Sequence, residues 1–284
     1  MPLAADFEVE LAGNEEAFQA GLTALSKIAK TYLGVGVEQH CNALGEAKNV
    51  ELNVFDGPCP AGNVGIQVNN IDPVNKGEVV WTVDPASVIF FGRLFLTGKV
   101  DLHKKVAVAG SEMKLTGYAN VLVGTPLAAF VEAQLKSTSH VRLINGNPLT
   151  GVKTTLTDYV GGHTSEITAI PEGDDCDEML GWILPRTDQF STSRSYLSWL
   201  FGKKKEYNLD ARIKGGERHM IMSGEYDQVL LWTSSVSISS RQIIAGDIDK
   251  QEQLGIYEVS PEDFAVAEFV DSSKLELQKI VRDG

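Results

Sequence analysis

Strand-like and helix-like patterns alternate through the first hundred residues, and this alternation sets the fold class. Residues 15–30 carry apolar side chains at helical spacing, behind Asn14, a residue type that favours helix N-caps. A short segment of alternating apolar and acidic residues precedes this helix at 7–11, and an apolar strand is expected after it at 32–37. Strand–helix–strand order of this kind is typical of α/β domains.

The same criteria place further elements along the chain. Extended segments are predicted at 50–55, 64–69, 78–83, 105–109, 114–118, 141–144, 152–156 and 165–170. Helices are predicted to begin at Pro85, at Thr125-Pro126 and at Ser260-Pro261, with others near 191–201 and 275–281. The apolar run 88–92 fits a helix or a strand equally well. After Gly110, one helix accompanied by about four short strands indicates a β-grasp module.

Charge and hydropathy exclude several classes of protein. The 284 residues are 43% hydrophobic and carry a net charge of −13, so the chain can bury a core but should repel nucleic acid. No run of about 18 apolar residues is present, so no membrane-spanning helix is expected. The N-terminal residues lack the basic and apolar regions of a signal peptide. The chain is therefore predicted to be cytoplasmic.

The metal-binding residue types are scattered. Cys41, Cys59 and Cys176 lie far apart, whereas disulfide scaffolds, zinc sites and iron–sulfur sites need closely spaced cysteines. We therefore predict no metal site. The acidic stretch 171–178 is interpreted as a solvated linker, with a cation site as the alternative.

No motif for catalysis or cofactor binding is present. The glycine-rich loop 57–62 contains two prolines, which lack the N–H donors of a phosphate-binding loop, so a turn is the better interpretation. The dinucleotide-binding pattern G-x-G-x-x-G, the Walker A motif and the hydrolase pattern G-x-S-x-G are all absent. We predict no catalytic residue and no cofactor-binding residue.

The segment 191–205 has the most distinctive local pattern in the chain. It combines a predicted amphipathic helix with three consecutive lysines at its end. One interpretation is a packed helix with a solvated end. The other is a docking edge for another protein of a complex or for anionic lipid headgroups. The candidate docking residues are Tyr196, Trp199, Phe201, Lys203, Lys204 and Lys205.

Several ordered blocks resemble a known family. They lie at 2–6, 55–62, 71–74, 80–82, 92–95, 97–98, 106–110, 181–194, 246–247, 254–255 and 262–263. Together they resemble the NqrA subunit of the bacterial Na⁺-translocating NADH:quinone oxidoreductase over essentially the whole chain. Family members are longer, so the resemblance implies a C-terminal fragment that lacks an N-terminal biotinyl-like domain.

The resemblance also implies a domain plan. Residues 1–112 would form part of a Rossmann-like domain related to the flavin subunit of respiratory complex I. Residues 113–172 would form an SLBB-type β-grasp domain, and 173–284 a mixed α/β region related to a degenerate iron–sulfur domain. Relatives with a cluster ligate it through cysteines, but the comparable stretch 264–274 contains none. The overall fold class is thus α/β combined with α+β.

The function implied is that of a subunit in a membrane complex. Such complexes transfer electrons from NADH to ubiquinone or menaquinone and export Na⁺, using NADH, flavins, iron–sulfur centres and quinone. This chain would be a peripheral subunit on the cytoplasmic face of the bacterial inner membrane. It would contact the other subunits, scaffold the quinone side without a redox centre of its own, and be inactive in isolation. The alternative hypothesis is a module that binds quinone or another small molecule through the β-grasp domain.

Overall fold

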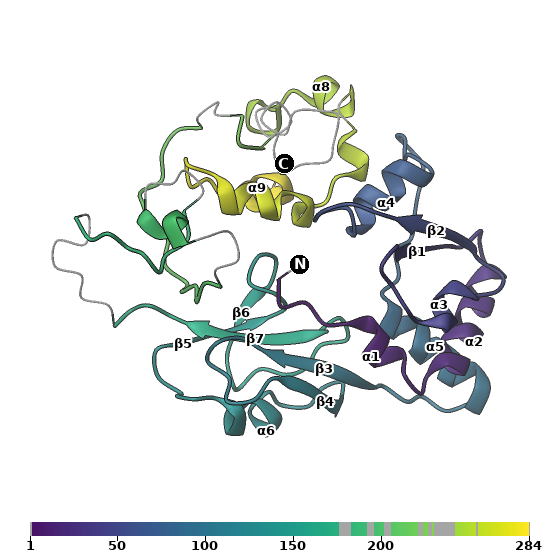
Figure 1. Cartoon of the computed structure of the whole chain (residues 1–284). Helices are drawn as coiled ribbons and strands as arrows, with labels where there is room; N and C mark the ends of the chain where they lie inside the picture. The colour runs from purple at the N-terminus through teal and green to yellow at the C-terminus, as the bar shows by residue number, and fades with distance from the viewer. Residues whose placement is uncertain are drawn as a thin grey trace. The chain divides into compact units, whose positions relative to one another are not determined.

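The computed structural model describes residues 2–175, 183–191, 196–201, 206–220, 224–226, 229, 242–253 and 255–283. The chain divides into two compact units, drawn together in Figure 1. The first contains 6–105 and 216–284, and the second contains 2–5 and 106–215. The domain boundaries expected at 112 and 172 stay predictions.

The first unit is built on two parallel strands and the helices that follow them. Strands β1 (Tyr32–Gly36) and β2 (Glu51–Phe55) pair with Val35 opposite Val54. The surrounding helices are α1 (Phe7–Leu11), α2 (Glu15–Ser26), α3 (Asn42–Gly45), α4 (Val64–Ile71) and α5 (Pro85–Thr97). The helix predicted at 15–30 and the strand predicted at 32–37 are confirmed as α2 and β1, whereas the strand predicted before them at 7–11 does not form.

Helices α2 and α5 form the main contact of this unit, and two glycines make it close. A Cβ atom on Gly21 would lie 2.1 Å from the carbonyl oxygen of Val88, and one on Gly92 would lie 1.6 Å from that of Ala17. Both distances are far below van der Waals contact, so the backbones meet where side chains are absent. The core around this crossing includes Phe18 and Ile89, both almost fully buried.

Helix α5 has clear signals at both ends. The carboxylate of Asp84 accepts a hydrogen bond from the backbone N–H of Ser87 at 3.2 Å, and Pro85 occupies the first turn. Gly98 ends the helix in the left-handed conformation, at φ 71°. The run 88–92, for which helix and strand fitted equally well, is helical.

The C-terminal part of the chain completes the first unit. It comprises α8 (Ile248–Gln253), the 3-10 helices η4 (Ile256–Glu258) and η5 (Pro261–Phe264), α9 (Ala265–Val270) and α10 (Leu277–Asp283). Ser260 and Asp263 form a capping box at the start of η5, which confirms the predicted helix start. Asn63 donates a hydrogen bond to Asp263 at 2.8 Å, so α4 and η5 are tied together across 200 residues of sequence.

The second unit is a five-stranded mixed sheet with a short helix on it. The strand order is β4-β3-β7-β5-β6. Its elements are β3 (His103–Ala109), β4 (Gly117–Leu122), α6 (Ala128–Val131), η1 (Glu132–Gln134), β5 (Val141–Asn145), β6 (Val152–Thr154) and β7 (Glu166–Pro171). Strands β3 and β7 are parallel, and β5 is antiparallel to both β6 and β7. One helical element on short strands agrees with the predicted β-grasp composition.

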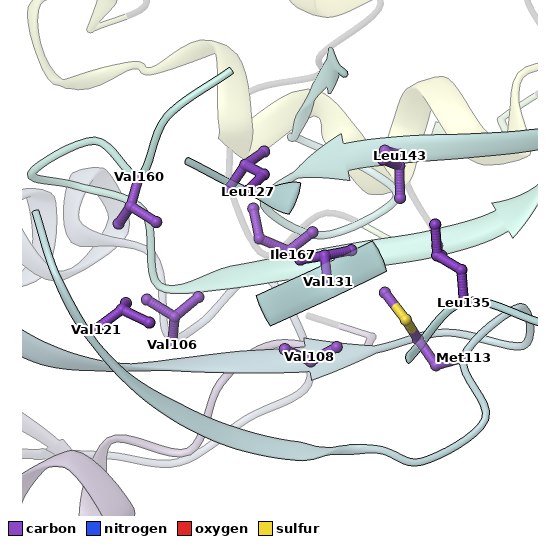
Figure 2. Packing of buried hydrophobic residues seen from close by; sticks show 11 residues of the cluster. Val106, Val108, Met113, Val121, Leu127, Val131, Leu135, Leu143, Val160 and Ile167 are labelled. Atoms are coloured by element: carbon purple, nitrogen blue, oxygen red, sulfur yellow. The ribbon is translucent and has the colours of Figure 1, made fainter. Parts of the chain in front are cut away.

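The core of the second unit lies between the sheet and α6. Figure 2 shows Val131 of the helix among Val106 and Val108 from β3, Ile167 from β7 and Leu143 from β5. Val106, Val131 and Ile167 are fully buried. Burying branched apolar side chains from strands and helix together is the main stabilising contribution in a module of this size.

Two segments predicted as extended are helical. Residues 7–11 form α1, because Asp6 caps a first turn and the neighbours Glu10 and Leu11 are both buried. A strand would place such neighbours on opposite faces. Residues 64–69 lie in α4, where the neighbours Gly65 and Ile66 are likewise both buried. The β-branched residues of that segment favoured a strand, and tertiary packing overrides this preference.

Three smaller predictions also need correction. No strand forms at 78–83. The strand predicted at 114–118 begins only at Gly117. The helix predicted to start at Thr125-Pro126 starts at Ala128, because the backbone N–H of Leu127 donates to Asp158 and that of Ala128 donates to Leu156. These bonds tie the residues around Thr125, the expected N-cap, to the segment 156–160.

Candidate docking surface

The predicted docking residues fall on and around the 3-10 helix η2 (Leu197–Phe201) in the second unit. The structure describes Tyr196 and Trp199, and the backbone of Phe201. Lys203, Lys204 and Lys205 lie outside the described residues, so the basic end of the predicted helix stays a prediction.

Contacts with the segment 183–191 fix the position of η2. The backbone N–H of Leu197 donates to the carbonyl of Pro185 at 3.1 Å. The guanidinium group of Arg186 lies 5.4 Å from the ring centre of Tyr196, within the range of a cation–π contact. Arg186 also donates to the side-chain oxygen of Gln189 at 2.7 Å. Tyr196 therefore helps to hold η2 in place.

Trp199 has a different environment. Ser198 is 2% exposed and faces inward, whereas Trp199 is 49% and Leu200 59% exposed. Consecutive residues on a helical turn point in different directions, so the buried serine leaves its two apolar neighbours toward solvent. Trp199 thus presents about half of its surface to solvent, as the docking interpretation requires.

Further apolar side chains near η2 extend this surface. The rings of Phe190 and Tyr207 meet edge to face at 5.6 Å, which links the segment before η2 with the segment after it. We define the η2 surface as the exposed apolar residues of these linked segments: Ile183, Leu184, Phe190, Leu197, Trp199, Leu200, Leu209 and Ile213. Only Trp199 was among the predicted docking residues. Five of the others lie outside the segment 191–205, in irregular stretches whose apolar residues have no periodicity.

Several charged groups in the second unit form ion pairs in or next to the segment 206–213. Burial alone would raise the pKa of Asp210, but its bonds with Arg212 at 2.7 Å and Lys214 at 3.2 Å outweigh burial and lower that pKa. Glu172 accepts from Arg142 at 2.6 Å and pairs with Lys153, and Arg142 lowers the pKa of Glu172 to about 2.

Two other groups were possible sites. His140, Asp174 and Asp175 have ligand atoms within 4.8 Å of one another, at the acidic stretch where a cation site was the alternative. All three are exposed, and Asp174 accepts from His140 at 2.9 Å, which raises the pKa of the imidazole. An ordinary ion pair explains this geometry.

A shallow cavity of about 650 Å³ lies in the first unit. It is lined by Glu217, Arg218, His219, Met220, Ile244, Ala245 and Leu275. The alternative hypothesis expected a quinone site in the β-grasp domain, which belongs to the second unit. The cavity therefore does not support that location.

Comparisons with known proteins agree on one family. Residues 1–100 match the family model described as the NqrA second alpha/beta domain, and 105–155 match the one described as the NQRA C-terminal domain. The chain is 33% identical over 283 residues to the NqrA subunit of the Na⁺-translocating NADH-quinone reductase of Vibrio atlanticus (strain LGP32). It is 34% identical over 283 residues to that of Vibrio anguillarum and 33% over 286 residues to that of Pasteurella multocida (strain Pm70).

These alignments cover 99% to 100% of this chain and 63% of each relative. The chain thus spans less than two thirds of the length of the relatives it matches. Within the described residues, no helix is long and apolar enough to cross a bilayer.

Proposed function

We propose that this chain, which belongs to the NqrA family of Na⁺-translocating NADH-quinone reductase subunits, works as a peripheral subunit that binds other subunits of such a reductase. Its relatives are named as subunits, so other subunits are its partners. The proposed complex transfers electrons from NADH to a quinone and exports Na⁺. The chain would lie at the cytoplasmic face of the membrane.

The η2 surface is the observation that carries this role. Large exposed apolar groups cost free energy in water, and clusters of them on a soluble domain mark sites of contact with other proteins. Trp199 is a good anchor for such a contact, because tryptophan buries a large area and is enriched among residues that dominate binding energy. The contacts of Leu197 with Pro185 and of Tyr196 with Arg186 hold η2 in place before binding, which reduces the entropy lost on association.

We further propose that the chain scaffolds the complex without a redox centre of its own. Within the described residues, the only group with metal-ligand spacing is the exposed His140, Asp174 and Asp175. One imidazole and two carboxylates, with no cysteine among them, do not supply the thiolates that hold iron–sulfur clusters. The two described cysteines, Cys41 and Cys59, form no disulfide.

Co-purification tests the binding role. We expect Trp199→Ser with Leu200→Ser to reduce recovery of the other subunits at least tenfold, because it removes the apolar centre of the surface. The matched control is Leu115→Ser with Val152→Ser, two side chains of the same unit that are 72% and 70% exposed but lie outside the η2 surface. The control should retain full recovery, and both double variants should unfold at the wild-type temperature.

Two results would oppose the proposal. Undiminished recovery with the Trp199 and Leu200 variant would show that the η2 surface binds no other protein of the complex. A stoichiometric flavin or iron spectrum in the purified chain, or NADH:quinone turnover by the chain alone, would refute the scaffold role.

A further inference from the structure

The segment from Val79 to Val83, between α4 and α5 in the first unit, is unusually exposed for its composition. Val79 is 77% exposed, Trp81 87%, Val80 50% and Val83 41%. With Thr82, these residues form a run of β-branched and aromatic residues, the types that favour strands. Single exposed apolar residues are common on protein surfaces, but five adjacent residues of strand-forming types are not.

The backbone of this segment also lacks partners. The chain makes no turn or bend from Glu78 to Asp84, so its course resembles that of a strand. Within the described residues, no backbone hydrogen bond involves the N–H or carbonyl groups of 79–83. Both its side chains and its backbone groups are therefore available to a partner.

The junction with α5 holds one end of the segment in place. Asp84 accepts from the backbone N–H of Ser87 at 3.2 Å and from its hydroxyl at 2.6 Å, and Pro85 fixes the backbone at the next residue. Beyond this junction, the outer face of α5 continues the exposed apolar character with Phe91, Leu94 and Phe95. Their spacing of three and four residues places them on one side of the helix.

The unpaired backbone distinguishes between possible partners. A lipid bilayer would cover the apolar side chains but would leave five N–H and five carbonyl groups without hydrogen bonds, at a cost of several kcal/mol each. A β-strand would contact the apolar side chains and pair the backbone groups along one edge, while the groups of the other edge stay in water. The segment therefore favours a polypeptide over a membrane.

The flanking charges argue against a second copy of the chain. Glu78 precedes the segment and Asp84 follows it. In an antiparallel pair centred on Trp81, Glu78 of each copy would lie opposite Asp84 of the other. In a parallel pair, each acid would lie opposite its own counterpart. Like charges opposite one another destabilise strand pairs, so the complementary strand carries Lys or Arg at these positions.

We infer that residues 79–83 are a docking site for one β-strand from another subunit of the same reductase. That strand would carry alternating apolar side chains between two basic residues. The inference rests on the proposed function and adds a second contact to the η2 surface. Its mode is different, because main-chain hydrogen bonds provide much of the contact.

Hydrogen exchange measures this pairing directly. In the purified chain, the amide hydrogens of 79–83 should exchange at close to the rate of an unstructured peptide. In the assembled reductase we expect the amides that face the added strand to exchange at least a hundredfold more slowly. Fast exchange in an assembled reductase would overturn the inference while leaving the proposed function intact.

Proline substitutions test whether the backbone is responsible. Thr82→Pro removes one N–H donor from a segment that makes no backbone hydrogen bond in the chain itself, so the fold should tolerate it. Thr82→Ala is the matched control. Val83→Pro with Val83→Ala provides a second pair at the other edge, because the N–H groups of neighbouring residues in a strand point in opposite directions. In the assembled reductase, we expect the slowing of amide exchange at 79–83 to be tenfold smaller in at least one proline variant than in its alanine partner. The unfolding temperature should not change. Equal protection in both pairs would overturn backbone pairing.

Three other outcomes identify a different partner or none. If the amides of 79–83 exchange more slowly as the concentration of the isolated chain rises, the partner is a second copy of the chain. Protection on adding vesicles of anionic phospholipid alone would indicate a membrane. Either result overturns the inference. If the wild-type chain does not co-purify with the other subunits at all, the proposed function fails together with the inference.

Discussion

Replacing Gly92 by alanine should open the crossing of α2 and α5. The new Cβ atom would lie 1.6 Å from the carbonyl oxygen of Ala17, and ordinary contact begins at 3.4 Å, so the helices must separate by about 1.8 Å. A backbone oxygen cannot rotate away as a side chain can. Separation also loosens the packing of Phe18 and Ile89, which are 2% and 0% exposed.

The expected loss of stability follows from two opposing effects. Overpacking of this kind costs up to about 3 kcal/mol, and alanine returns about 1 kcal/mol over glycine through helix propensity. The net loss of about 2 kcal/mol lowers the unfolding temperature of a unit of this size by roughly 4–8 °C. Differential scanning calorimetry is the appropriate assay, because it measures both the temperature and the enthalpy of unfolding.

Gly45→Ala is the matched control for Gly92→Ala. Gly45 is the last residue of the short helix α3. Its new Cβ atom would lie 3.6 Å from the side-chain nitrogen of Gln39, which is an ordinary contact distance. The control should melt at or above the wild-type temperature. A Gly92→Ala variant that does the same would refute the argument that close backbone contact at this crossing requires glycine.

Three further predictions concern stability and are measured by denaturant or thermal unfolding. Ile167→Ala should cost about 2–5 kcal/mol because it leaves a cavity in the core of the second unit, and a loss below that of exposed Val152→Ala would contradict this. Ser260→Ala should cost about 1 kcal/mol by removing the capping box of η5, and an unchanged melting temperature would count against the cap. The pKa of Glu172 is about 2 in the folded chain and ordinarily 4.5, so its pairing with Arg142 stabilises fully above pH 4.5 and is lost as the pH falls toward 2. Arg142→Ala should therefore destabilise the chain at neutral pH and lose that effect in acid, and an equal effect at both would exclude the pair as its cause.

The sequence predicts an element well where one local signal dominates. Helix α5 was predicted to begin at Pro85 and does so, although the apolar run 88–92 within it had fitted a helix and a strand equally well. Strands β5 and β7 are short apolar runs between turns and are likewise confirmed. Such signals act within a few residues, so composition and spacing are sufficient to find them.

Prediction fails where distant residues decide the local conformation. Alternation at 7–11 indicated a strand, yet the carboxylate of Glu10 accepts from the backbone N–H of Lys105 at 2.7 Å and becomes a buried part of α1. Thr125 lost its predicted capping role to backbone bonds with the segment 156–160. Neither partner can be identified from local sequence, because each lies more than 30 residues away.

The candidate surface shows the same division. Trp199 was predicted as a docking residue because it lies in an aromatic, lysine-flanked segment; it is half exposed, and its docking role stays a prediction. Tyr196 came from the same pattern but contacts Arg186, ten residues earlier in the chain. Ile183 and Ile213 were missed, since only the folded chain brings their segments together with η2.

Residues 78–83 show why a failed secondary-structure prediction can still carry information. The residue types predict an extended strand, and the backbone runs without a bend, but the hydrogen bonds that define a strand are missing. Local preference is thus satisfied and only the neighbour is lacking. At 64–69 the outcome differs, because helix formation satisfies the backbone groups within the segment itself. Residues 79–83 therefore have backbone groups that a partner strand could pair, whereas residues 64–69 pair theirs within α4.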